Sequence, residues 1–201
     1  MKTRKIAFTV LFALFFIPGM FGQYEIGDKV DGFKLESTEG EYISLSDYED
    51  EEGIILVFTC NTCPFAQKYE QRIIDLDKTY AKKGYPVLAI NPNCVSKKPG
   101  DSMEAMDERS IDKGYSFAYL KDNGQKVAKE FGAERTPEIY LLENRDDGFY
   151  LVYTGTIDNN VDDPSKADEH YVKNAIEDLM ENKNVALAET KAIGCTIKWS
   201  E

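Results

Sequence analysis

An apolar run in this sequence leads directly into two cysteines and then into a helical pattern, and this order limits the possible folds. Residues 54–58 are all apolar and rich in β-branched side chains, which is typical of a strand covered on both faces. Cys-Asn-Thr-Cys follows at 60–63, and Pro64 suits the first turn of a helix. Apolar residues then recur at spacings of three and four, which predicts an amphipathic helix over 64–82. The C-x-x-C motif is therefore predicted to lie where a buried strand ends and a helix begins.

The remaining apolar runs alternate between strand-like and helix-like patterns. This alternation indicates an α/β fold with a central β-sheet flanked by helices. We expect the strands at 54–58 and 87–90 to be parallel neighbours joined by a right-handed crossover. The segment 149–154 should return antiparallel after a turn, which makes the sheet mixed. The other predicted elements are an N-terminal β-hairpin extension at 33–35 and 42–45, strands at 117–120 and 139–142, and helices at 102–113, 124–131 and 169–182.

The N-terminus has the pattern of a secretory signal peptide. Three basic residues precede an apolar run from Ile6 to Ile17, and Pro18 and Gly19 end that run. The run is short for a membrane-spanning helix, so we expect cleavage near residue 22; the alternative is an uncleaved anchor. The prediction is an exported protein, periplasmic or secreted, with a signal peptide at 1–22, one domain over 23–201 and no stable membrane insertion after cleavage.

The charge balance narrows the set of partners. The chain has 201 residues, of which 36 are acidic and 24 are basic, so its formal net charge is −12. Nucleic-acid binders present basic stripes, and none is visible in this sequence. We therefore expect neither nucleic acid nor an anionic membrane surface as a partner.

The position of the C-x-x-C motif carries redox chemistry. The N–H groups and the dipole at a helix N-terminus stabilise negative charge, so we expect a cysteine there to have a lowered pKa and to react as a thiolate. The second cysteine lies one turn further along and can attack a mixed disulfide. The alternatives are half of a zinc site, which needs a second close ligand pair, and a structural disulfide, which would close a very small loop. The remaining cysteines, Cys94 and Cys195, and the single histidine, His170, are isolated in the sequence, so no metal is expected.

A Thr136-Pro137 pair precedes the strand predicted at 139–142. An X-Pro bond between a helix end and a strand can be cis, and it can equally be a plain turn proline. The sequence leaves these two alternatives open.

These features together resemble the thioredoxin superfamily. A strand entering C-x-x-C-P, then helix, strand and helix, and later Thr-Pro opening a β-hairpin, is similar to its redoxin (AhpC/TSA-like) branch. That branch includes peroxiredoxins and exported TlpA/ResA-like thiol–disulfide oxidoreductases. The resemblance covers roughly residues 25–200. The segments that carry it are 27–35, 58–65, 89–93, 132–137 and 194–199.

The resemblance implies roles for particular residues. It implies a thioredoxin-like fold, a nucleophilic Cys60, a resolving Cys63 and a cis Pro137 that faces them. Thr136 would offer backbone pairing to a substrate, and Arg135 would either face the disulfide and lower the thiol pKa or point outward. The implied activity is exchange with protein or small-molecule disulfides and thiols, with an upstream thiol as electron donor and no cofactor.

The sequence also departs from the family pattern. Thr59 replaces the usual tryptophan before the first cysteine, and residues 54–59 contain no carboxylate that could accept a proton. Glu52 lies too early for that role. The proton acceptor for Cys63 is therefore open.

Two other functions compete with thiol–disulfide exchange. Peroxiredoxins carry P-x-x-x-T-x-x-C, and counting back from Cys60 gives Val57 and Gly53, so this peroxide-binding pattern is missing; counting back from Cys63 fails likewise. Sco-like copper-binding modules, which need not be catalytic, use C-x-x-x-C-P plus a distal histidine. Here the spacing is one residue shorter, and His170 stands at a predicted helix start.

Cys94 and Cys195 allow three arrangements. They could form a structural bridge that closes a long loop, remain free thiols, or provide a further redox partner for Cys60. The export signal favours the bridge without excluding the other two.

Overall fold

The computed structural model describes residues 23–200. The predicted signal peptide at 1–22 lies outside these described residues. The strands are β1 (Lys34–Ser37), β2 (Tyr42–Ser44), β3 (Gly53–Phe58), β4 (Val87–Asn91), β5 (Ala118–Lys121), β6 (Arg135–Thr136), β7 (Glu138–Arg145), β8 (Gly148–Gly155) and β9 (Cys195–Thr196). The α-helices are α1 (Pro64–Tyr80), α2 (Met103–Lys113), α3 (Lys126–Phe131) and α4 (Tyr171–Met180). Within residues 23–200, no helix has the length and apolar character needed to cross a membrane.

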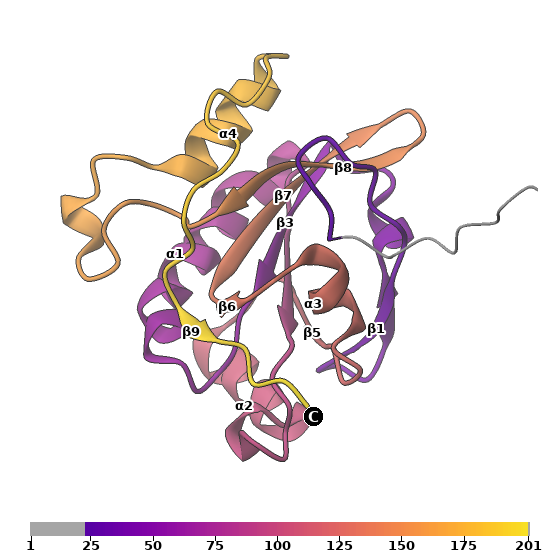
Figure 1. Ribbon diagram of the computed structural model, residues 1–201, viewed down its shortest axis with the longest axis vertical. Coiled ribbons are helices and arrows are strands. Elements are labelled where there is room, and N and C mark those ends of the chain that lie inside the picture. The colour runs from indigo at the N-terminus through magenta and orange to yellow at the C-terminus, as the bar shows by residue number, and fades with distance from the viewer. Residues whose placement is uncertain (1–22, 201) are drawn as a thin grey trace, which may run out of the picture.

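A mixed seven-stranded sheet in the order β2-β1-β5-β4-β3-β7-β8 forms the centre of the molecule (Figure 1). β3 and β4 are parallel neighbours, and β7 and β8 form an antiparallel hairpin, as the sequence predicts. The apolar residues of β3 are inaccessible to solvent because both faces of this strand are covered. The predicted α/β fold with a mixed sheet is therefore confirmed.

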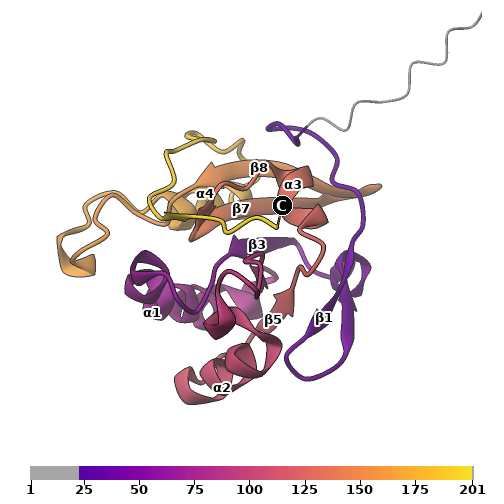
Figure 2. The ribbon, with the colours of Figure 1, turned by 60° about the horizontal axis from the view of Figure 1, so that its bottom comes forward.

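The helices divide between the two faces of the sheet (Figure 2). Alternate residues of β3 pack either with Tyr69 of α1 and Ile176 of α4, or with Phe131 of α3. Met106 of α2 packs against Ala89 and Tyr119 on the same face as α1. This double coverage explains why the central strands are apolar on both sides rather than alternating.

The predicted N-terminal hairpin extension is also confirmed. β1 and β2 pair antiparallel, and β1 continues the sheet by pairing antiparallel with β5. The hairpin thus forms one edge of the sheet, with β2 as the outermost strand, and β8 forms the opposite edge.

A second, two-stranded sheet of β6 and β9 was not expected from the sequence. β9 crosses the molecule near the end of β3 at which α1 begins (Figure 1). β6 and β9 have only two residues each, which is too short for any periodic pattern. This small sheet brings the C-terminal segment to the cysteines.

Candidate functional site

The C-x-x-C motif lies at the junction that the sequence predicts. Cys60 comes two residues after Phe58, the last residue of β3, and Cys63 is the N-cap of α1, with Pro64 at its first position. Both cysteines are almost completely buried, with exposed fractions of 4% and 3%.

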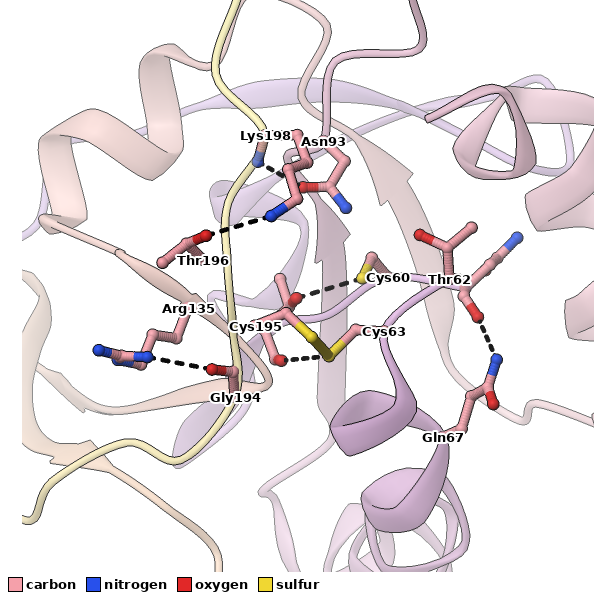
Figure 3. The surroundings of a disulfide bond; sticks show 12 residues. Cys60, Thr62, Cys63, Gln67, Asn93, Arg135, Gly194, Cys195, Thr196 and Lys198 are labelled. Atoms are coloured by element: carbon pink, nitrogen blue, oxygen red, sulfur yellow. Dashed lines mark hydrogen bonds between the residues drawn. A yellow bond between two sulfur atoms is a disulfide. The ribbon is translucent and has the colours of Figure 1, made fainter. Parts of the chain in front are cut away.

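Both sulfur atoms converge on one residue, Thr136 (Figure 3). Cys60 Sγ is 3.2 Å from Thr136 Oγ1, and Cys63 Sγ is 3.1 Å from the Thr136 carbonyl oxygen. The Thr136–Pro137 peptide bond is cis, as the resemblance implied. The cis-proline segment therefore forms the wall of the site opposite the cysteines.

Cys63 is disulfide-bonded to Cys195, whereas Cys60 and Cys94 are free thiols. The bond joins residues 132 positions apart, with a Cα–Cα distance of 6.0 Å. The expected Cys94–Cys195 bridge is wrong for this structure because Cys195 is already bonded to Cys63. A Cys60–Cys63 disulfide is likewise not the one present here.

The pairing of β9 with β6 explains this arrangement. Thr136 lies opposite Cys195 in the antiparallel register, so the residue that contacts both C-x-x-C sulfurs also positions the third cysteine. Gly194 passes so close to Thr136 that a Cβ atom there would overlap the Thr136 carbonyl group. Glycine is therefore required for this approach.

We call residues 194–200 the C-terminal strap. Ile197 is buried in the core, and its N–H donates to the Glu134 carbonyl oxygen. The Lys198 N–H donates to Asn93 Oδ1, and the Cys94 N–H donates to the Lys198 carbonyl oxygen. The strap is thus docked along its length.

Arg135 neither faces the sulfur atoms nor points freely into solvent. Its guanidinium donates a 3.1 Å hydrogen bond to the Gly194 carbonyl oxygen (Figure 3). The fixed charge of Arg135 therefore anchors the strap.

The pKa of the Cys60 thiol is raised, contrary to the expectation from its place beside a helix N-terminus. Burial is the main cause, and the negative charge of Asp101 adds to it. Hydrogen bonds from the Thr136 hydroxyl and from the N–H groups of Cys63 and Thr62 oppose the shift. With the strap docked, the cost of burying a charge exceeds the stabilisation that these donors give to the thiolate.

Asp101 is the functional candidate that the sequence did not reveal. It lies in the 3₁₀ turn Pro99–Asp101 and is fully buried. Its carboxylate accepts hydrogen bonds of 2.7 Å each from the Asn61 N–H and the Thr62 hydroxyl. It also accepts hydrogen bonds from the side-chain amides of Asn91, at 3.2 Å, and Asn93, at 2.9 Å. All four donors are neutral groups. Its carboxylate therefore holds the two residues between the cysteines in place.

The Asp101 network also reaches the strap. Asn93 donates to Asp101 through its amide nitrogen and accepts the Lys198 N–H through its amide oxygen. Lys121 is buried and donates to the Asn93 carbonyl oxygen. Burial lowers the pKa of Lys121, and the Asp101 carboxylate opposes this shift. Only the Asn91-Pro-Asn93 segment pointed to this region in the sequence.

The features required for a copper site are not brought together. His170 directly precedes α4 without a side-chain capping hydrogen bond, and it lines a separate cavity of about 420 Å³ with Arg72 and Asp158, away from the cysteines. Across residues 23–200, no three His, Cys, Asp or Glu side chains cluster so that they could hold a metal ion.

Comparison with known proteins identifies the family. The AhpC/TSA family model matches residues 26–158. An uncharacterized conserved protein from Geobacillus kaustophilus is 30% identical, with a TM-score of 0.80 over 89% of this chain and 94% of that chain. A hypothetical protein from Sinorhizobium meliloti 1021 is 28% identical, with a TM-score of 0.80 over 89% and 97%.

A more distant structure, peroxidoxin BcpB from Mycobacterium tuberculosis, is 18% identical, with a TM-score of 0.56 over 68% of this chain and 88% of that chain. At this identity the likeness supports the thioredoxin-like fold alone. No curated protein matched the sequence. The family match spans all strands of the seven-stranded sheet and the whole C-x-x-C region, and so the chain belongs to the AhpC/TSA family, within the redoxin branch of the thioredoxin superfamily.

Proposed function

We propose that the protein is an exported thiol–disulfide oxidoreductase in which Cys60 and Cys63 exchange disulfides with a substrate. One observation carries this proposal. A free thiol, Cys60, lies beside a disulfide at Cys63, and both sulfur atoms contact Thr136 next to the cis Pro137. A free thiol adjacent to a disulfide is the arrangement that exchange requires.

The reaction begins with the reduced protein. The Cys60 thiolate attacks one sulfur of a substrate disulfide, forms a mixed disulfide and releases the other sulfur as a thiol. The Cys63 thiolate then attacks Cys60 Sγ, which releases the second substrate thiol and leaves a Cys60–Cys63 disulfide. An upstream thiol donor returns the pair to the reduced form, and the reverse sequence would oxidise a substrate.

The Thr136 hydroxyl and the backbone N–H groups of Thr62 and Cys63 support the first step. They are the groups that lower the pKa of Cys60 against the effect of burial. The strap covers the site, so a substrate gains access only when the strap moves. Departure of the strap would also rehydrate Cys60, which weakens the main cause of its raised pKa.

Export, a periplasmic or secreted location and the absence of stable membrane insertion after cleavage remain part of the proposal. The basic and apolar pattern of residues 1–22 supports them. The proposed partners are protein or small-molecule disulfides and thiols, with an upstream thiol electron donor. The strong negative charge makes nucleic acid an unfavourable partner.

The test is reduction of insulin disulfides by the purified protein with dithiothreitol as the electron donor, alongside consumption of hydrogen peroxide. We expect insulin reduction that is lost in Cys60→Ser and Cys63→Ser and retained in the matched control Cys94→Ser. If the protein consumes hydrogen peroxide and does not reduce insulin, the peroxidase alternative replaces the proposal. Retained insulin reduction in Cys60→Ser would remove Cys60 from its role.

A further inference from the structure

The C-terminal strap delivers a cysteine to the site by backbone pairing rather than by chance proximity. Cys195 lies opposite Thr136 in the β6–β9 register, and Gly194 fits against the Thr136 carbonyl where no other residue would fit. Arg135 and Asn93 bind the strap on either side of Cys195. Four separate features of the chain thus fix the position of a single sulfur atom.

The disulfide that results lies beside an unused thiol. Cys60 and Cys63 belong to one buried cluster, and Cys195 packs against that cluster. The Thr136 hydroxyl contacts Cys60 Sγ, and the Thr136 carbonyl contacts Cys63 Sγ. Figure 3 shows the three cysteine side chains directed toward the same space. Cys60 is therefore a free thiol in the same buried cluster as the Cys63–Cys195 bond.

We infer that Cys195 is a third redox-active cysteine, which competes with Cys60 for the disulfide to Cys63. The inference rests on the proposed function and extends it from a pair of cysteines to three. The Cys60 thiolate attacks Cys63 Sγ, so that the Cys60–Cys63 bond forms as the Cys63–Cys195 bond breaks. Cys195 leaves as a thiolate and takes up the proton that Cys60 has lost. No net oxidation occurs, and the reverse step restores the Cys63–Cys195 bond.

The two disulfide isomers have different consequences for the site. In the Cys63–Cys195 isomer, the strap is covalently attached and covers both C-x-x-C cysteines. In the Cys60–Cys63 isomer, only hydrogen bonds and the packing of Ile197 and Trp199 hold the strap, and the edge of β6 can be exposed. The exchange thus links the redox state of Cys60 to access to the site.

The experiment uses the Cys94→Ser protein, because it contains only three cysteines. After oxidation to one disulfide per chain, a single free thiol remains, and its position identifies the isomer. The protein is quenched with acid, labelled with N-ethylmaleimide and mapped by mass spectrometry. A label on Cys60 reports the Cys63–Cys195 bond, and a label on Cys195 reports the Cys60–Cys63 bond.

We expect both labels in the same oxidised sample. Gly194→Ala weakens the docking of the strap without removing a sulfur atom, so it should raise the Cys195 label severalfold. The matched control is Gly124→Ala, where a new Cβ meets no atom within 4 Å, and it should leave the ratio unchanged. Two results would overturn the inference. One is a ratio of Cys195 label to Cys60 label that Gly194→Ala leaves unchanged. The other is a sample in which one of these two cysteines carries the label in fewer than about one chain in a hundred.

Failure of the inference and failure of the proposed function are distinguishable. Suppose that Cys195→Ser forms a Cys60–Cys63 disulfide and reduces insulin, while the three-cysteine protein shows one isomer only. Then the redox role of Cys195 is rejected and the proposed function stands. If circular dichroism shows that Cys195→Ser is folded, and this variant still neither forms the Cys60–Cys63 disulfide nor reduces insulin, the proposed function itself fails.

Discussion

Replacement of Cys195 by serine should destabilise the oxidised protein by a predictable amount. The Cys63–Cys195 bond joins residues 132 positions apart, and in the chain-entropy model such a crosslink contributes about 5 kcal/mol to stability. In Cys195→Ser, the remaining pair is Cys60 and Cys63, whose small loop contributes only about 1.6 kcal/mol in the same model. The oxidised variant should therefore be less stable than the oxidised wild type by about 3 kcal/mol.

The assay is urea unfolding followed by circular dichroism, with and without dithiothreitol. With a denaturant dependence of about 2 kcal/mol per M, the oxidised variant should unfold at a urea concentration lower by roughly 1.5 M. Under reducing conditions, the two proteins should unfold within about 0.5 kcal/mol of each other, because the serine replaces a partly exposed thiol. Cys94→Ser serves as the control and should match the wild type in both conditions.

Two outcomes would contradict a stabilising Cys63–Cys195 crosslink. Equal unfolding midpoints for the oxidised wild type and the oxidised variant would mean that the long crosslink does not form. A difference that persists in dithiothreitol would mean that Cys195 stabilises the strap by packing rather than by its covalent bond.

Three further predictions concern the environment of Cys60. In oxidised Cys94→Ser, labelling of Cys60 by iodoacetamide should accelerate with rising pH, with a midpoint above the ordinary thiol value, because burial raises its pKa; a midpoint at or below the ordinary value would contradict the burial argument. Thr136→Val removes the hydroxyl that lowers the Cys60 pKa, so the midpoint should rise further and labelling at pH 8 should slow; faster labelling would contradict this. Asp101→Asn removes a negative charge near the Cys60 thiolate, so the midpoint of Cys60 labelling should fall. The hydrogen-bond donors that lose their carboxylate partner should lower the free energy of unfolding in urea by about 1–3 kcal/mol. A higher midpoint would show that the charge of Asp101 does not act on Cys60.

The sequence predicted the sheet because its central strands are apolar on both faces. Residues 54–58 and 87–90 could be identified from five and four consecutive apolar residues, and the helix from 64 onward from its spacing. The junction of β3 and α1 then located Cys60 and Cys63 correctly. These are local patterns, and local patterns are what a single sequence contains.

The pairing of the cysteines could not be predicted because it depends on contacts between distant segments. Nothing near Cys195 indicates that two residues of β9 will pair with two residues of β6. Asp101 was missed for a similar reason, since its four hydrogen-bond donors come from the C-x-x-C loop, from the last residue of β4 and from the segment after it. The pKa of Cys60 was predicted in the wrong direction because the helix N-terminus is visible in the sequence, whereas the burial of the thiol is not.

The most direct test of the account is a redox titration of the purified protein in glutathione buffers, with each cysteine followed by alkylation and mass spectrometry. We expect a reversible two-electron disulfide that involves Cys63, with a midpoint between about −120 and −270 mV, the range of dithiols that exchange disulfides. A Cys63 disulfide that stays fully oxidised below about −300 mV would instead be structural. That result, or a Cys63 thiol that never oxidises, would contradict the assignment as a thiol–disulfide oxidoreductase.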